Sequence, residues 1–224
     1  MLPKLVWDMP KYGTFNLHAS LLPNYRGAAP INWAIINGES KTGVTTFYID
    51  DKIDTGAMIL NAETAVGANE SAGELHDRLM ELGSETVIQT LRLVEKESVI
   101  TTVQEDNDEI KTAYKLNKEN CKIDWNKSAL DIHNLIRGLS PYPAAWSFIS
   151  DKGEEWNVKI YQSNIIIEAH TLAVGKLVCT KKELKIAVRD GFIQIESLQF
   201  PGKKKMNTAE FLNGIQFTAD AKAY

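Results

Sequence analysis

The stretch from Phe15 to Glu39, FNLHASLLPNYRGAAPINWAIINGE, decides the fold of the first part of this chain. Residues 15–18 are typical of a short β-strand, and the polar loop after them contains prolines and a glycine. Pro30 is suited to the first turn of a helix, and the apolar residues that follow it predict a helix that closes at Asn37 and Gly38. The stretch therefore predicts a strand, a loop and a helix in succession.

The same alternation of strands and helices continues to about residue 96. Residues 44–49 and 57–60 predict two further strands, separated by a loop that begins with Asp50, Asp51 and Lys52. A long helix is predicted from Ser71 to about Lys96, because Ser71 and Glu74 form a capping box. Leucines at helical spacing predict the face that packs on the sheet: Leu75, Leu79, Leu82 and Leu91. The first part is therefore expected to be an α/β domain.

The second half of the chain changes its periodicity. The polar segment 105–127 predicts a linker, and a short helix should follow, capped by Ser128 with Asp131 and closed by Gly138. Three apolar residues are expected to face inward from this helix: Leu130, Leu135 and Ile136. Five short β-type runs come next, at 146–149, 158–161, 176–180, 184–188 and 192–198. Several short strands within about eighty residues predict a small, OB-like β-barrel.

Bulk composition is that of an ordinary globular protein. Of 224 residues, 44% are hydrophobic and 24% are charged, which excludes disordered, collagen-like and coiled-coil classes. No apolar run is long enough to span a membrane and the start does not resemble a secretory signal, so we expect a cytoplasmic protein with no membrane partner. Cys121 and Cys179 lie far apart without ligand spacing, which favours reduced thiols and predicts neither a disulfide nor a metal site.

The net charge of −4 hides a difference between the two halves. Residues 1–110 carry a charge of −9 and residues 111–224 a charge of +5. We expect this division to match two domains, with the linker beginning the second. A basic module favours a polyanionic partner such as RNA, because lysine and arginine neutralise phosphates. The alternative, an ordinary solvated lysine surface, stays open on this evidence.

Three residues of the first half could handle protons together. Asn16 and His18 are two positions apart on a predicted strand, so their side chains share one face. Asp54 follows a strand in a turn from which its carboxylate could reach a neighbouring strand. An imidazole beside a carboxylate could donate to a developing oxyanion, with the Asn16 amide as the second donor. The alternative is a satisfied histidine and a turn aspartate, and we interpret His76, His133 and His170 as structural.

At these residues the chain resembles the folate-dependent formyltransferases, whose pattern of Asn-x-His, a Ser-Leu-Leu-Pro loop and a later Asp is matched here. The matching residues are Asn16, His18, Ser20, Leu21, Leu22, Pro23 and Asp54. Four longer blocks are similar to the branch of this family that formylates methionyl-tRNA: the opening stretch, YKLNKENCKIDW, IRGLSPYPAAW and QFPGKKKMNTAEFLNG. The resemblance covers nearly the whole chain.

This resemblance implies a Rossmann-like catalytic domain and transfer of a formyl group from 10-formyltetrahydrofolate, without a metal, to the amino group of initiator methionyl-tRNA. It implies catalytic roles for Asn16, His18 and Asp54. It places folate beside Ser20, Leu21, Leu22, Pro23, Asp50 and Asp51. The basic barrel would meet tRNA phosphates through Lys203, Lys204 and Lys205, and the linker through Lys115 and Lys118.

Family members have further strand–helix units before the Met-Leu-Pro segment at which this sequence opens. We therefore expect a chain that lacks the first part of the catalytic domain and has little or no activity by itself. The strand of Asn16 would have an exposed edge, which favours oligomerisation. Two alternatives remain: a formyltransferase that acts on a sugar-nucleotide amine, and a non-catalytic RNA-binding module.

Overall fold

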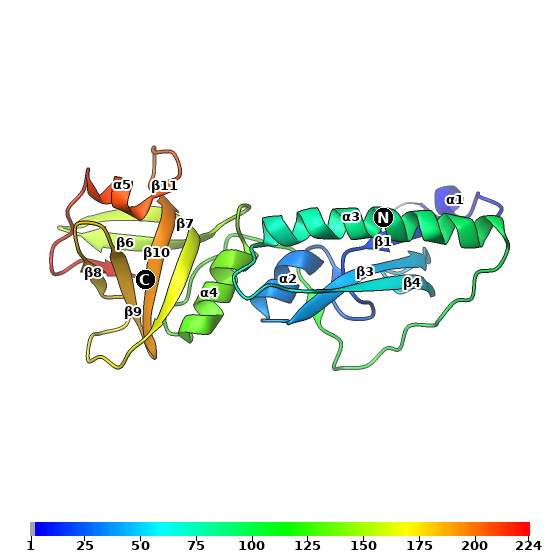
Figure 1. Cartoon of the computed structure of the whole chain (residues 1–224), viewed down its shortest axis with the longest axis horizontal. Coiled ribbons are helices and arrows are strands. Elements are labelled where there is room, and N and C mark those ends of the chain that lie inside the picture. The colour runs from blue at the N-terminus through cyan, green and yellow to red at the C-terminus, as the bar shows by residue number, and fades with distance from the viewer. Residues whose placement is uncertain (1–2) are drawn as a thin grey trace. The chain divides into compact units, whose positions relative to one another are not determined.

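The computed structural model describes residues 3–224, so Met1 and Leu2, which begin the Met-Leu-Pro segment, lie outside the described residues. The chain divides into two compact units (Figure 1). The first unit comprises residues up to 34 together with 39–115, and the second comprises 35–38 together with 116–224. The boundary between the two units therefore lies inside the polar segment 105–127, between Lys115 and Leu116.

The first unit is built around a three-stranded antiparallel sheet. Its order is β1 (Phe15–His18), β3 (Lys41–Tyr48) and β4 (Met58–Ala65). Helix α3 (Ala72–Glu95) runs along β3 and β4 (Figure 1), and the shorter helices are α1 (Lys4–Trp7) and α2 (Pro30–Ile36). Among the described residues β1 pairs only with β3, so it is an edge strand and the expected oligomerisation through it stays a prediction.

Helix α3 begins as the sequence predicts. The Ser71 side chain accepts from the Glu74 amide, and the Glu74 carboxylate accepts from Ser71 N, which completes the capping box. The buried face consists of Ala72, Leu75, Leu79, Gly83, Thr86 and Thr90. Leu91, which we expected on this face, is instead 47% exposed. Sixteen residues separate it from Leu75, and at 3.6 residues per turn that places it on the far side of the helix.

The second unit is the expected small barrel. Six strands form an antiparallel sheet in the order β12-β6-β7-β10-β9-β8. Its edges meet, because Ala223 N donates to Gly175 O at 2.8 Å and Leu177 N donates to Ala221 O at 3.2 Å. The strands are β6 (Ala145–Asp151), β7 (Glu154–Ile167), β8 (Leu177–Cys179), β9 (Leu184–Val188), β10 (Gly191–Gln199) and β12 (Lys222–Ala223); β11 (Met206–Asn207) pairs with β10 and precedes α5 (Thr208–Leu212).

Helix α4 (Ala129–Gly138) closes one part of the barrel core. Ser128 caps it by accepting from the Asp131 amide, as predicted. Ile132 and Ile136 are buried one turn apart, whereas Leu130 is 57% exposed and was wrongly expected to face inward. Two residues along an α-helix correspond to about 200°, so Leu130 and Ile132 face opposite sides.

The polar segment 105–127 is packed at both of its ends. Within it, β5 (Thr112–Ala113) pairs in parallel with β2 (Arg26–Gly27) of the first unit. Further along, Cys121, Ile123 and Trp125 are buried in the barrel core. Three apolar side chains spaced two apart are enough to anchor an otherwise polar segment. Among the helices of residues 3–224, none combines the length and apolar character needed to cross a membrane.

Candidate active site

The edge strand β1 presents the two residues of the Asn-x-His pattern. Asn16 lies opposite Phe47 and His18 opposite Thr45 in the ladder with β3. Leu17, between them, faces α3, where a Cβ added at Gly83 would come within 2.7 Å of the Leu17 side chain. Alternation along the strand therefore directs Asn16 and His18 away from α3, as the sequence predicts. His18 is buried, at 6% exposure, and Asn16 is exposed.

Both ring nitrogens of His18 face protein oxygens. Nε2 lies 2.7 Å from the carbonyl oxygen of Tyr25, and Nδ1 lies 3.7 Å from Oδ2 of Asp54. A carbonyl oxygen can only accept a hydrogen bond, so Nε2 carries the hydrogen in this contact. Nδ1 is then the ring nitrogen that faces the Asp54 carboxylate.

Asp54 occupies the loop between β3 and β4. Its backbone is in the left-handed region, with φ of 55°, and its Oδ2 accepts from Gly27 N at 3.0 Å. The same oxygen therefore lies between a backbone amide and the imidazole of His18. The three residues that the sequence singled out come from β1 and this loop, and the structure brings His18 and Asp54 together.

Hydrogen bonds within the loop stabilise the residues that precede Asp54. Asp50 Oδ1 accepts from Lys52 N and from Thr55 Oγ1, each at 2.9 Å. Asp51 is exposed and Asp50 is half-buried. Asp50 thus fixes the turn with its side chain, while Asp51 is open to solvent.

The Ser20–Pro23 loop lies directly after β1. Ser20 is fully buried, and its hydroxyl donates to Asn24 O at 2.7 Å. Leu22 is buried, its N donates to Thr45 Oγ1 at 3.1 Å, and its bond to Pro23 is cis. Leu21 and Pro23 are half-buried. The bond from Leu22 N holds this loop against β3, and the bond from Ser20 to Asn24 closes the loop on itself, so together they fix the wall next to His18.

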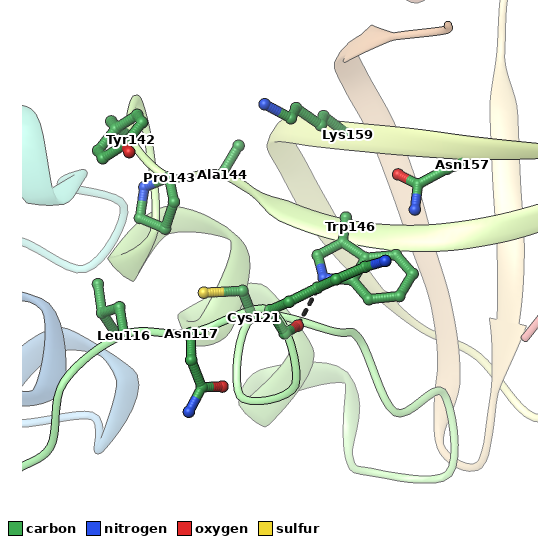
Figure 2. Close-up of a pocket in the computed structure, with 10 residues that line it drawn as sticks. Leu116, Asn117, Cys121, Tyr142, Pro143, Ala144, Trp146, Asn157 and Lys159 are labelled. Atoms are coloured by element: carbon green, nitrogen blue, oxygen red, sulfur yellow. Dashed lines mark hydrogen bonds between the residues drawn. The ribbon is translucent and has the colours of Figure 1, made fainter.

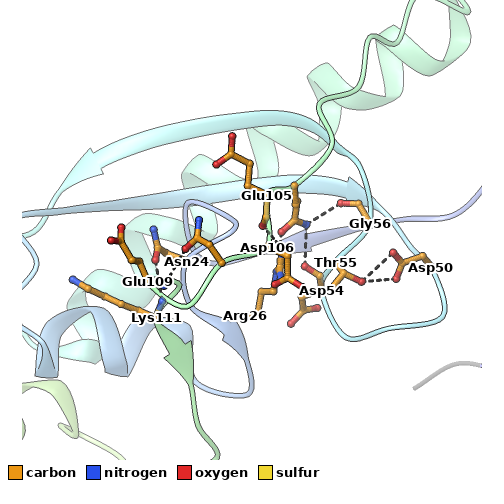
Figure 3. Close-up of polar contacts among 12 residues, drawn as sticks. Asn24, Arg26, Asp50, Asp54, Thr55, Gly56, Glu105, Asp106, Glu109 and Lys111 are labelled. Carbon is orange, nitrogen blue, oxygen red and sulfur yellow. Dashed lines mark hydrogen bonds and ion pairs between the residues drawn. The ribbon is translucent and has the colours of Figure 1, made fainter.

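Two residues that the sequence did not single out, Gln104 and Arg26, complete the polar contacts of this site. Figure 3 shows Arg26 and Asp54 among the residues of these contacts. Gln104 donates to the carbonyl oxygens of Asp54 and Gly56 at 2.9 and 2.8 Å. Its own Oε1 accepts from Arg26 Nε at 2.9 Å. The position of Gln104, fifty residues after Asp54 in a polar segment, gives no sequence signal for these contacts.

The five lysines expected to contact RNA are all exposed and all outside this site. Lys203, Lys204 and Lys205 follow β10, where Lys205 Nζ lies 4.7 Å from the ring centroid of Tyr161. The second unit has a cavity of about 340 Å³, and Lys118 is one of its lining residues. Figure 2 shows Trp146 and Lys159 at this cavity. The carbonyl of Lys118 accepts from Trp146 Nε1 at 2.8 Å, and its ammonium lies 5.4 Å from the Trp146 ring centroid.

Metal-ligating side chains do not gather anywhere in residues 3–224: no group of three or more His, Cys, Asp or Glu could hold an ion. Cys121 and Cys179 are both free. Burial raises the pKa of the Cys121 thiol, which keeps it protonated at neutral pH.

Comparison with known proteins assigns both units. Residues 1–91 match the family described as formyl transferase, and residues 115–216 match the formyl transferase C-terminal domain. The methionyl-tRNA formyltransferase of Flavobacterium johnsoniae is 70% identical over all 224 residues, which span 71% of that protein. The chain belongs to the methionyl-tRNA formyltransferase family.

Other members and neighbours agree with this membership. The methionyl-tRNA formyltransferase of Flavobacterium psychrophilum is 59% identical over the whole chain and 71% of its own length. Among solved structures, WlaRD, a sugar 3N-formyl transferase crystallised with dTDP and 5-N-formyl-THF, is 26% identical with a TM-score of 0.63. That match covers 85% of this chain and 66% of WlaRD. The sequence-based expectation of a formyltransferase is confirmed.

Proposed function

We propose that Asn16, His18 and Asp54 carry the chemical step of methionyl-tRNA formylation. Through its family the chain is a formyltransferase of translation initiation. The observation that supports these three residues is the approach of His18 Nδ1 to Asp54 Oδ2 at 3.7 Å, next to the exposed amide of Asn16 on the same strand face. The donor in this proposal is 10-formyltetrahydrofolate, and the acceptor is the α-amino group of methionine on initiator tRNA.

In this mechanism the amine nitrogen attacks the formyl carbon and a tetrahedral oxyanion develops. The Asn16 side-chain amide and the protonated Nδ1 of His18 donate to that oxygen. Tyr25 O accepts from Nε2, which leaves Nδ1 as the nitrogen directed toward the reaction. The Asp54 carboxylate lies 3.7 Å from that nitrogen and orients the ring. Collapse of the oxyanion then breaks the bond from the formyl carbon to the folate nitrogen, and that nitrogen receives a proton originally carried by the amine.

The loops on either side of His18 are the proposed folate contacts. Ser20, Leu21, Leu22 and Pro23 form one wall, fixed by the hydrogen bond from Leu22 N to Thr45 Oγ1. Asp50 and Asp51 belong to the loop that carries Asp54. Carboxylates and loop carbonyls can accept hydrogen bonds from the N–H groups of a pterin.

RNA contacts are proposed for the exposed lysines. Lys203, Lys204 and Lys205 form a compact basic turn, and Lys115 and Lys118 are further exposed lysines of the linker. Phosphate contacts of this kind position an RNA without reading its sequence. A sugar-nucleotide acceptor would not need them, and the 70% identity to a methionyl-tRNA enzyme favours the RNA acceptor.

Formyl transfer to charged initiator tRNA tests this proposal. The assay compares the chain, a hybrid that adds the segments of the Flavobacterium johnsoniae relative outside the match, and the hybrid with His18→Ala. His76→Ala is the matched control, because His76 is an exposed histidine of the same unit. We expect activity in the hybrid and the control, loss of at least about a hundredfold in His18→Ala, and little or none in the chain alone. Undiminished activity of His18→Ala would overturn the assignment of the chemistry, and tRNA binding without activity in any form would favour the RNA-binding module.

A further inference from the structure

We propose that Gln104 is a positioning residue of this site: its side-chain amide fixes the loop that carries Asp54, and thereby sets the carboxylate beside His18. This inference rests on the proposed roles of His18 and Asp54. It assigns a role in the site to the segment after α3, which lies far from the other site residues in the sequence.

The amide of Gln104 is almost completely buried, and every one of its polar atoms is used. Its exposure is 8%. Nε2 donates one hydrogen to Asp54 O and the other to Gly56 O, while Oε1 accepts from Arg26 Nε. Arginine can only donate and carbonyl oxygens can only accept, so only one of the two orientations of the amide satisfies all three partners.

The loop needs such a support because its backbone is unusual. Asp54 has a positive φ of 55°, and two residues later Gly56 passes so close to Tyr48 that an added Cβ would lie 1.7 Å from the Tyr48 carbonyl oxygen. Residues in sparsely populated backbone conformations persist when the surrounding contacts fix them. The side chain of Asp50 holds the start of the loop, and Gln104 holds its end through the carbonyls on either side of Thr55.

Gln104 also connects this loop to the segment on the opposite side of the carboxylate. Arg26, whose Nε donates to the Gln104 oxygen, directly precedes Gly27. The Gly27 N–H in turn donates to Asp54 Oδ2. The Arg26 guanidinium additionally contacts Asp106 Oδ1 and Glu105 O, each at 3.2 Å (Figure 3). Arg26 thereby braces the segment that carries Gln104. One side chain thus holds both the backbone of Asp54 and the strand that binds its carboxylate.

Substitutions can distinguish the donor role of the Gln104 amide from its acceptor role. Gln104→Glu keeps an acceptor for Arg26 and removes both donors to the loop. Gln104→Met has a similar length and removes all three hydrogen bonds. Gln89→Met is the control, because Gln89 is an exposed glutamine of the same unit.

The first readout is the Gly27 amide proton in nitrogen-15 NMR spectra of the full chain, which needs no catalytic activity. Both Gln104 variants should move the Gly27 resonance and speed its hydrogen exchange by about tenfold or more, because the hydrogen bond to Asp54 Oδ2 opens more often. Gln89→Met should leave both unchanged. An unchanged Gly27 amide in Gln104→Glu would overturn the proposal, because the glutamine would then act only on Arg26. If Gln104→Met unfolds, Gln104→Glu still decides the question.

The second readout is kinetic and uses the hybrid. Gln104→Glu should lower kcat by about ten- to a hundredfold with little change in KM for tRNA, since a misplacement near 1 Å can cost that much. Adding Gln104→Glu to Asp54→Asn should cause little further loss. Fully additive losses would contradict positioning through Asp54. If instead His18→Ala stays active, the proposed chemistry fails, while the NMR result still tells whether Gln104 holds the loop.

Discussion

His18 and Tyr25 are joined by a hydrogen bond from the imidazole Nε2 to a backbone carbonyl oxygen, at 2.7 Å. Tyr25 reaches this position through a positive φ of 63°, which turns the chain after the Ser20–Pro23 loop back toward β1. The contact engages Nε2 with the backbone, and so leaves Nδ1 as the ring nitrogen that is available to the proposed reaction. Because a backbone carbonyl cannot be removed by a side-chain substitution, this part of the site depends on the course of the loop.

Replacing Asn16 should impair catalysis without affecting the fold. Asn16 is exposed on an edge strand, so Asn16→Ala is expected to leave the unfolding transition unchanged. Loss of one oxyanion donor should lower kcat of the hybrid by about a hundred- to a thousandfold. Steady-state formylation kinetics together with urea unfolding measure both quantities. A loss confined to KM would mean that Asn16 binds substrate equally in the ground and transition states.

Substituting Gly27 should damage the same site through the backbone. Its φ is 123°, and an added Cβ would lie 2.4 Å from the carbonyl oxygen of Ala113. Gly27→Ala should therefore weaken the pairing of β2 with β5 and destabilise the first unit by more than about 1 kcal/mol. Urea unfolding followed by circular dichroism measures this, with Gly153→Ala as the comparison, since its surroundings leave open space for a Cβ although its φ is also positive. Equal effects of the two substitutions would show that φ alone matters.

The barrel should lose stability as the pH falls below about 6.5. Burial lowers the pKa of His133, and the nearby Arg137 lowers it further, so the folded state binds this proton less readily than the unfolded state. Stability from this group is therefore complete above the unfolded pKa near 6.5 and declines as the pH falls toward the lower folded pKa, by at most about 1.4 kcal/mol per pH unit.

Tryptophan fluorescence, to which the buried Trp125 of the barrel contributes, measures this dependence during urea unfolding at pH 7.5 and 5.5. His133→Gln should reduce it, and His76→Gln, at an exposed histidine, should not. A pH dependence that survives in His133→Gln would assign the effect to other groups.

Charge removal at the basic turn should change how RNA binding depends on salt. Replacing Lys203, Lys204 and Lys205 by alanine should weaken tRNA binding at low salt. The logarithm of the binding constant falls with the logarithm of the salt concentration. The steepness of this fall should be reduced by up to about 0.9 for each phosphate that a lysine no longer neutralises. Lys181→Ala with Lys182→Ala is the control on another exposed turn of the barrel. An unchanged slope in the triple variant would place the RNA surface elsewhere.

Local patterns predicted most of the elements because the determinants are short-range. The capping box at Ser71, the turn at Asn37–Gly38 and the two-residue alternation of β6 each act within a few residues. Errors arose where one residue had to be assigned to a helix face over a longer distance. Leu91 and Leu130 are apolar and lie in helices, yet the phase of each helix turns them toward solvent.

The sequence by itself determined the order of the longer strands and helices, the family, and the presence of Asn16, His18 and Asp54 as chemically suitable residues, but not the short elements α1, β2, β5, β11, α5 and β12. Tertiary structure decided that His18 Nε2 is bound to Tyr25 O, that Asp54 shares its carboxylate between Gly27 and His18, and that Gln104 supports the loop. Those contacts join residues up to fifty positions apart, and three of them end on a backbone carbonyl or amide. Almost every residue type has these groups, proline alone lacking the N–H, so a residue pattern does not encode them, and only the folded path of the chain brings them within hydrogen-bonding distance.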